Sequence, residues 1–509
     1  MSSCEDMTVG GRMMTESRTL TPSRAPSQSR ALLPTLVFVT LVVSIISSLG
    51  APLIPTIATE TGVSLATAQW ILTVTLLVGA IATPILGRLG DGRRRREAAL
   101  TALVLVVVGA VLAALPLSFA ALIAGRGLMG VGLALTPLAM AAARDAIAGQ
   151  RGRRAIAMLS VSTATGIGLG YPLTSLVAEV WSFRAAFWFG AAIAAVALVA
   201  AIPTFPRTPD RPPRRLDLVS CLLVAPGLAL LLLAMSQYGT WTGQAVAVIA
   251  ATALVLLAAW IVREVHSAAP LVNLRLVILP GVLAADLIGF FGTFGVYTTM
   301  TVSIRFVQTP TDAGYGFGQS VFVAGLTLVP LSVFTVAANR LTGPLARRFG
   351  PDLILPLGCF LFAAAGATFL LAHSSLWQIF LIMGIGGLAM GCTSTAMPGL
   401  IVRSVPADET SSAMSFNQVL RFLGGAVGSA LTATVLENHT PVGAHLPTLD
   451  GYVVIVWTSM ISLVLAGIVA AVLQRRARGH DVDRADAALL EEESMADAYP
   501  IGAPRTNET

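Results

Sequence analysis

The feature that most constrains the fold of this chain is a series of apolar segments, each long enough to cross a lipid bilayer. We identify fourteen, at about 31–58, 66–87, 97–115, 118–141, 154–178, 184–203, 217–236, 244–262, 281–304, 318–341, 352–372, 376–401, 411–436 and 452–473. A helix of about 20 apolar residues crosses a hydrocarbon core about 30 Å thick. Only 11% of the residues are charged, against about 25% in soluble domains. The sequence therefore predicts an all-α, multi-pass membrane protein with 14 transmembrane helices.

The arginines predict how these helices are oriented. No lysine occurs, so all 32 basic residues are arginine. Short loops rich in arginine stay on the cytoplasmic side, and Arg93–Arg96 is such a loop. With this loop in the cytoplasm, 28 of the 32 arginines are cytoplasmic, Arg184 and Arg305 are external, and Arg126 and Arg421 lie within segments. We therefore expect a cell-membrane protein with both termini in the cytoplasm.

A proline-rich, charged loop follows the sixth segment and divides the chain. The predicted parts are a disordered cytoplasmic tail (1–30), a six-helix bundle (31–203), a linker with two extra helices (204–280), a second six-helix bundle (281–473) and a second disordered tail (474–509). Loops rich in proline and charge are typical linkers.

Two loops at matching places in the bundles share a motif. Gly87, Asp91 and Arg95 fit the pattern Gly-x-x-x-Asp-(Arg/Lys)-x-Gly-Arg-(Arg/Lys), and Gly343 and Gly350 repeat its glycines. The first loop resembles the conformational-switch loop between helices two and three of the major facilitator superfamily. The order of six, two and six helices resembles the fourteen-span drug:proton antiporter branch. The resemblance implies the major facilitator fold and proton-coupled efflux of amphipathic drug-like or self-made small molecules.

Arg126 lies well inside the fourth segment. A charged side chain there costs several kcal/mol unless it is paired or faces water. The stretch resembles the family motif Arg-x-x-Gln-Gly, with Met129 in place of the glutamine, and the resemblance implies a role in proton coupling. The alternative is an arginine that reaches to the membrane surface.

The fifth segment contains Gly166, Gly170, Tyr171 and Pro172. It resembles the antiporter motif Gly-x-x-x-Gly-Pro, with Tyr171 inserted before the proline. The resemblance implies export, whereas glycines spaced in this way also serve close helix packing alone.

Asp286 lies in the ninth segment between apolar neighbours. An intramembrane carboxylate suggests a functional site, here a group that takes up and releases a proton. The alternative is a carboxylate stabilised by the free N–H groups at a helix start. Related antiporters carry an aspartate in the first helix, but Ile45–Pro55 has none. We therefore predict Asp286 as the titrating group, together with Arg126.

Four aromatic residues in the segments are candidates for lining a substrate cavity: Trp70, Phe290, Phe294 and Tyr297. Aromatic rings there suit an apolar or cationic substrate. Packing against helices or lipid is the alternative.

Other functions lack support in the sequence. The five histidines are scattered and the four cysteines show no paired spacing, so we expect no metal site and no cofactor. No catalytic constellation is apparent, so we do not expect an enzyme. The expected partners are a small-molecule substrate, protons and the lipid bilayer, without nucleic acid, and the expected state is a monomer. An importer or uniporter on the same fold remains an alternative, as does a non-transporting membrane sensor or enzyme.

Overall fold

The computed structural model describes residues 26–91, 93–147, 149–206, 217–236, 241–267, 274–405, 410–441, 444 and 446–498. In this part of the chain all regular structure is helical. It holds 13 helical stretches long and apolar enough to cross a membrane, and Val219–Met235 is a shorter apolar helix. The all-α membrane architecture is confirmed, and the expected fourteenth span is this short one.

The first eight α-helices form the N-terminal half. They are α1 (Pro26–Ser48), α2 (Ile54–Thr61), α3 (Leu65–Asp91), α4 (Arg95–Ala114), α5 (Phe119–Gly130), the 3-10 turn η1 (Val131–Ala134), α6 (Leu135–Ala146), α7 (Gly149–Val180) and α8 (Phe183–Thr204). They share one buried apolar core that runs from Leu32 to Phe205.

Two further helices, α9 (Leu218–Ser236) and α10 (Gly243–His266), and the short α11 (Leu274–Val277) precede the C-terminal half. That half consists of α12 (Pro280–Gln308), the 3-10 turn η2 (Thr311–Ala313), α13 (Val321–Leu326), α14 (Val329–Phe349), α15 (Pro351–Leu371), α16 (Leu376–Ser404), α17 (Thr410–Asn438) and α18 (Leu449–Ala498).

The first predicted span is interrupted in the structure. One helix was expected over 31–58, but α1 ends at Ser48 and α2 begins at Ile54. Gly50 has φ 99° and Pro52 lacks an N–H, so both residues favour this interruption.

The terminal helices also extend beyond their predicted limits. α1 begins at Pro26 and α18 continues to Ala498, so 26–30 and 474–498 are helical where disordered tails were expected. The extension of α18 holds six alanines and four arginines, and both residues are strong helix formers. The remaining tail residues, 1–25 and 499–509, lie outside the described residues.

Hydroxyl side chains begin the helices at one end of the molecule. Five helices there start after a capping residue whose side-chain oxygen accepts a hydrogen bond from the backbone N–H three residues on: Ser64, Ser118, Ser182, Thr242 and Ser320. Such caps satisfy N–H groups that have no partner within the helix. We call this the capped end. The other, arginine-rich end carries the Arg93–Arg94 turn.

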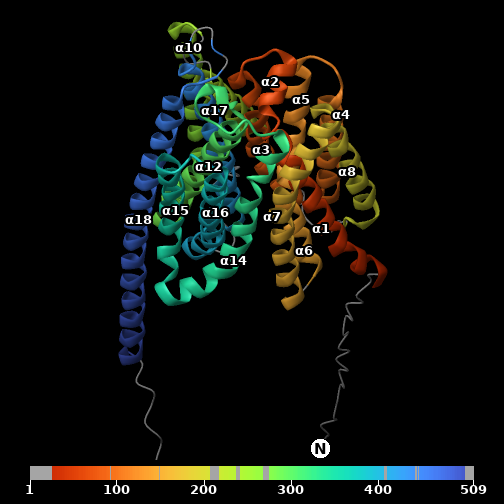
Figure 1. The fold of residues 1–509 in the computed structure, drawn as a ribbon. Coiled ribbons are helices and arrows are strands. Elements are labelled where there is room, and N and C mark those ends of the chain that lie inside the picture. Colours follow the sequence, from red (N-terminus) through yellow and green to blue (C-terminus); the bar gives the residue numbers. More distant parts are fainter. Residues whose placement is uncertain are drawn as a thin grey trace, which may run out of the picture.

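The two halves stand side by side (Figure 1). They touch along two seams, one between α3 and α17 and the other between α7 and the α13–α14 pair. At the arginine-rich end, α6 and α14 stand apart in Figure 1. The halves are therefore joined closely at the capped end and diverge on one side at the arginine-rich end.

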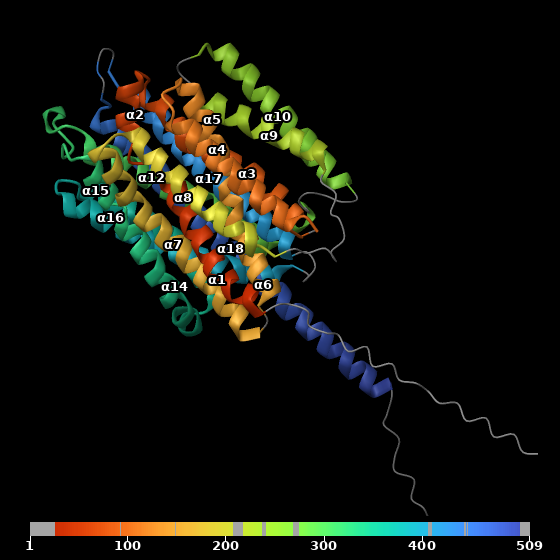
Figure 2. The same ribbon diagram turned by 90° about the vertical axis from the view of Figure 1, so that its right-hand side faces the viewer.

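The α9–α10 hairpin lies along the first of these seams (Figure 2). Leu228 and Leu232 of α9 join a buried cluster with Leu76 of α3 and Ala426 of α17. α9 thus contacts both halves, whereas the membrane-spanning window of α10 is only 6% buried.

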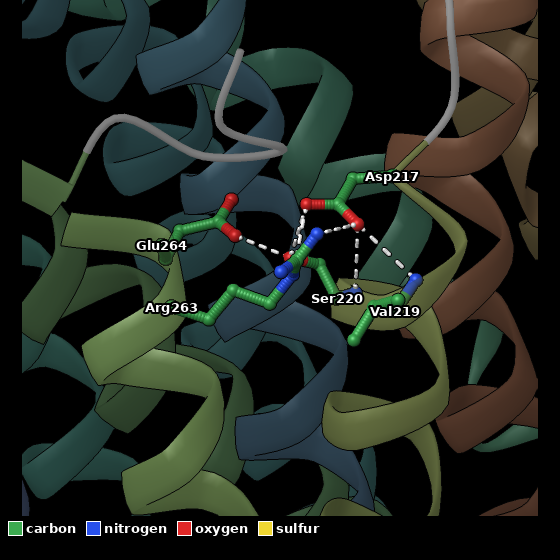
Figure 3. A network of polar contacts seen from close by, with 5 residues as sticks. All are labelled: Asp217, Val219, Ser220, Arg263 and Glu264. Carbon is green, nitrogen blue, oxygen red and sulfur yellow. Dashed lines mark hydrogen bonds and ion pairs between the residues drawn. The ribbon is translucent and has the colours of Figure 1, made fainter. Parts of the chain in front are cut away.

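A polar clasp of Asp217, Ser220, Arg263 and Glu264 closes the arginine-rich end of this hairpin (Figure 3). Arg263 donates to Asp217 through Nε at 3.1 Å and through Nη2 at 2.8 Å, and Ser220 Oγ donates to Glu264 Oε2 at 2.7 Å. The hydrogen bond from Arg263 lowers the pKa of Asp217, although burial partly opposes it. Because Asp217 therefore stays charged at neutral pH, the clasp holds α9 to α10 independently of physiological pH changes.

Candidate functional site

Arg126 on α5 lies in the interior of the N-terminal half. It is 0% exposed. Its Nε donates to the backbone oxygen of Ile71 on α3 at 3.3 Å, and its Nη1 donates to that of Ile46 on α1 at 3.4 Å. Its Nη2 has no hydrogen-bond partner. A side chain enclosed in this way does not reach the membrane surface, which removes the alternative weighed from the sequence.

One of these two partners lies at the interruption between α1 and α2. Ile46 is in the last turn of α1, and its oxygen also accepts from the backbone N–H of Leu49 at 3.2 Å, whereas Ile71 lies within α3. A Cβ atom on Gly50 would lie 3.7 Å from Arg126 Cζ, an ordinary van der Waals distance, so Gly50 borders the guanidinium. Arg126 thus ties α5 to the end of α1 and to α3.

Asp286 on α12 is 2% exposed. Its Oδ1 accepts a hydrogen bond from Asn417 Nδ2 on α17 at 3.0 Å, and the same nitrogen donates to the backbone oxygen of Ala285 at 3.0 Å. Asp286 Oδ2 is buried and has no hydrogen-bond partner. The partner of this carboxyl group is therefore a side chain 131 positions away, rather than the N–H groups at the start of α12.

Arg421 lies one turn after Asn417 on α17. Its Nη2 donates to Ser394 Oγ on α16 at 3.3 Å and its Nη1 to Gln418 Oε1 at 3.4 Å. A Cβ atom on Gly289 would lie 3.1 Å from Arg421 Cγ, so this glycine of α12 makes room for the arginine. Sequence reasoning located Arg421 inside a span but assigned it no function.

The predicted cavity aromatics occupy different surroundings. Trp70 packs against the cluster beneath α9. Phe294 is 4% exposed, and its backbone oxygen faces Gly428 of α17. The backbone oxygen of Phe290 faces Gly424 in the same way. Trp70 and Phe294 therefore contribute to packing between helices.

Tyr297 has the most central position of these residues. Its ring packs against three separate buried clusters. A Cβ atom on Gly425 of α17 would lie 2.9 Å from its Cδ2, so the ring packs directly on that helix. Tyr171, the residue inserted into the antiporter-like motif, also reaches the other half, since its hydroxyl donates to the sulfur of Met300 on α12 at 3.3 Å.

The antiporter-like motif of α7 packs directly on α1. A Cβ atom on Gly166 would lie 2.6 Å from the backbone oxygen of Leu41, and one on Gly170 would clash with Ser48 Oγ. Pro172 lies inside α7, which continues through it. Close packing accounts for both glycines, and the link to export stays a prediction.

The predicted conformational-switch loops are anchored differently in the two halves. Arg95 is 1% exposed, and it donates to Asp145 Oδ2 at 2.5 Å and to the backbone oxygen of Gly90 at 2.6 Å. These bonds fix the start of α4 to the ends of α3 and α6. The partnership of Arg95 with Asp145, 50 positions away, was not predicted from the sequence.

The other residues of these loops have less defined surroundings. A Cβ atom on Gly87 would lie 3.9 Å from Ser415 Oγ on α17, and Asp91 ends α3 with its side chain outside the described residues. In the second copy Gly343 is exposed, and Gly350 joins α14 to α15 with φ 88°, a conformation that favours glycine.

A group that we call the Gln69 cluster (Gln69, Thr301, Arg305 and Ser429) joins the halves near the capped end. Gln69 Nε2 donates to Ser429 Oγ at 2.7 Å and to Thr301 Oγ1 at 3.3 Å. Arg305 Nη2 donates to Gln69 Oε1 at 3.3 Å and to the backbone oxygen of Leu65 at 3.0 Å. The sequence analysis missed this cluster, although a glutamine within an apolar segment is a signal that a search for polar residues would find.

Two more hydrogen bonds join the halves at the same end. Gln308 Nε2 donates to the backbone oxygen of Pro52 at 2.9 Å, and the backbone N–H of Phe322 donates to Glu179 Oε2 at 2.7 Å. The capped end is therefore closed by polar contacts on both seams. In the described part of the chain no group of His, Cys, Asp and Glu residues is arranged to hold a metal ion.

Comparison with known proteins agrees with this architecture. The chain is 27% identical over 426 residues to the multidrug efflux pump LfrA of Mycolicibacterium smegmatis, covering 82% of each chain. It is 29% identical over 408 residues to the cephamycin export protein CmcT of Amycolatopsis lactamdurans, covering 76% of this chain and 81% of that protein. Its fold matches a crystal structure of the peptide transporter POT in complex with sulfate with a TM-score of 0.65, at 16% identity and over 88% of this chain and 94% of that chain. The sequence profile of the Major Facilitator Superfamily matches residues 36–429, and the chain therefore belongs to this superfamily of membrane transporters.

Proposed function

We propose that this transporter exports amphipathic, drug-like or self-made small molecules in exchange for protons. The observation that carries the proposal is Asp286, a carboxyl group in the interior with an unpartnered Oδ2. The similarity to drug efflux and antibiotic export proteins supports the direction of transport. The chain then acts as a monomer that moves its substrate without changing it chemically.

The proposed orientation places the arginine-rich end in the cytoplasm. A cysteine at the exposed position Asp450 should then react with a membrane-impermeant maleimide added to intact cells, whereas one at the exposed position Arg94 should react only after lysis. The four native cysteines are replaced first. Labelling of the Arg94→Cys variant in intact cells, without labelling of Asp450→Cys, would reverse the orientation.

The proposed conformation is closed to the outside and open towards the cytoplasm. The contacts at the capped end support it, because the Gln69 cluster and Glu179 join both seams there. The divergence of α6 and α14 supports an inward opening. A substrate would enter from the cytoplasm, and the halves would then rock about the central helices, as in transporters built from two related halves.

Asp286 and Asn417 couple proton binding to this motion in the proposal. The carboxyl group and the amide lie on α12 and α17, and α17 forms the seam with α3 of the other half. A proton on the free Oδ2 of Asp286 turns the hydrogen bond from Asn417 to Oδ1 from a charge-assisted one into a weaker, neutral one. The protonation state therefore alters the contact between α12 and the seam helix.

Transport in proteoliposomes tests the proposal. The probes are 1-pyrenebutyrate, an anion, and 1-pyrenebutyltrimethylammonium, a cation with the same ring. We expect the wild-type protein to accumulate at least one probe when a pH gradient is imposed, and a protonophore to abolish accumulation. Asp286→Asn should lose the accumulation but still exchange the probe at equal concentrations. Asp312→Asn, an exposed carboxylate at the capped end, is the matched control.

Three results would contradict the proposal. The first is that the wild-type protein moves neither probe. The second is that a probe only equilibrates whatever the pH gradient, which indicates a uniporter. The third is that Asp286→Asn accumulates the probe with the pH dependence of the wild-type protein.

A further inference from the structure

The charges in the middle of the molecule do not balance. Arg126 lies within α5, Arg421 lies near the middle of α17, and Asp286 lies within α12. Asp286 binds Asn417 rather than either arginine. No ion pair joins these three residues in the described part of the chain. When Asp286 is ionised, the interior therefore still carries more positive than negative charge.

The two arginines differ in their exposure and in their hydrogen-bond partners. Arg126 is 0% exposed, and its partners are backbone oxygens. Arg421 is partly exposed, and its partners are the neutral oxygens of Ser394 and Gln418 at 3.3 and 3.4 Å. Hydrogen bonds between a guanidinium and an anionic oxygen are shorter, about 2.7–2.9 Å. Arg421 can therefore exchange these long contacts for an anion.

Two glycines let the side chains of Arg421 and Tyr297 each pack closely against the helix that faces their own. Gly289 of α12 allows the stem of Arg421 to pass, and a Cβ atom on Gly425 of α17 would lie 2.9 Å from Tyr297 Cδ2. Gly425 lies one turn after Arg421 on α17, so the Tyr297 ring contacts this helix one turn beyond Arg421. A hydroxyl and a guanidinium are both hydrogen-bond donors, so together they suit a carboxylate.

The same arrangement disfavours a cationic substrate. The carboxyl group of Asp286 is 2% exposed, whereas the partly exposed charged group is Arg421. A cation placed there would meet a positive charge in a medium of low dielectric constant, where repulsion is strong. The rings of Phe290 and Phe291, 5.1 Å apart and edge to face, offer an apolar surface on the same helix as Tyr297.

We propose that Arg421 and Tyr297 bind the carboxylate of an amphipathic organic acid, and that such acids are the preferred substrates. This inference rests on the proposed export function and narrows its substrate class. Arg421 supplies the charge and two N–H groups, and Tyr297 supplies a hydroxyl from the facing helix. The sequence alone favoured an apolar or cationic substrate, because it showed the aromatics but not the unpaired arginine.

The pyrene probes test the charge preference in liposomes of phosphatidylcholine alone, so that anionic lipid cannot occupy the site. We expect the wild-type protein to move 1-pyrenebutyrate faster than 1-pyrenebutyltrimethylammonium, after subtraction of protein-free liposomes. Arg421→Gln should reduce transport of the anion by about tenfold or more, as for the loss of a charge-assisted hydrogen bond. Arg421→Lys should retain part of the rate, since it keeps the charge but not the planar fork.

Arg403→Gln is the control, because this exposed arginine binds only the backbone oxygen of Gly399. The inference is overturned if the wild-type protein prefers the cation, or if folded Arg421→Gln moves the anion at the wild-type rate. The wild-type preference needs no variant, so the test stands even if Arg421→Gln does not fold. If the wild-type protein moves neither probe, the export function itself fails, which is a separate outcome.

Discussion

Replacement of Arg126 with alanine is expected to abolish transport while the protein remains in the membrane. The guanidinium connects α5 to the carbonyl of Ile71 and to that of Ile46, where the first span is interrupted. Its loss leaves both oxygens without this donor, so the segment between α1 and α2 is no longer held to α5. We expect transport of 1-pyrenebutyrate in proteoliposomes to fall by at least about tenfold, which corresponds to about 1.4 kcal/mol.

Two further variants separate coupling from stability in this experiment. Arg126→Lys keeps a charge but reaches fewer acceptors, so its rate should lie between those of the wild type and alanine variants. Arg184→Ala removes an arginine that lies 5.0 Å above the ring of Phe183 near the capped end and should transport normally. Full transport by Arg126→Ala, with an unchanged melting temperature, would show that the buried arginine is dispensable.

Gln69→Ala is expected to shift the transporter towards an outward-open conformation. The substitution removes the acceptor of Arg305 and the donor to Ser429, both across the seam between the halves. Losing a hydrogen bond to a charged group costs about 1.5–3 kcal/mol. Since these bonds form when the capped end is closed, the population of the open form should rise by about tenfold or more.

Labelling of a cysteine at the buried position Ala51 measures this shift. Ala51 lies beside Gln69 and Arg305 and is 1% exposed, so an external maleimide should react slowly with Ala51→Cys alone and faster when Gln69→Ala is added. Thr67→Ala is the control, because Thr67 is an exposed residue two positions before Gln69 on the same helix. Equal labelling rates with and without Gln69→Ala would show that the cluster does not hold the outer side closed.

The helices could be predicted because lipid allows few alternatives. Backbone polar groups must be satisfied within each segment that crosses the hydrocarbon. Long runs of apolar residues therefore predicted most of the membrane-spanning helices near their observed positions. The first span was predicted without its break because hydropathy continues across residues 49–53, where Gly50 and Pro52 were the available local signals. The extension of α18 past 473 was missed because its residues are polar. Hydropathy identifies segments that lie within the membrane, and it does not show whether a polar segment is helical.

The contacts between distant residues could not be predicted in this way. Asp286 and Asn417 are 131 positions apart, and Gln69 and Ser429 are 360 apart. Each was visible as a polar residue in an apolar run, but the pairing depends on how α12 and α3 pack against α17. Arg126 shows the same limit: its hydrogen-bond partners, the carbonyl groups of Ile71 and Ile46, lie 55 and 80 positions away.

The place of α9 has a consequence for molecules that are dissolved in the bilayer. Such a molecule can approach the interior sideways only where the two halves meet. Leu228 and Leu232 of α9 cover the seam between α3 and α17, so that route is blocked by protein along the membrane. The second seam, between α7 and α14, is the one whose helices part towards the arginine-rich end (Figure 1). In the proposed orientation, an amphipathic compound that first partitions into the inner leaflet would therefore enter laterally from one side of the transporter, between α7 and α14, with its polar group facing the cytoplasmic water.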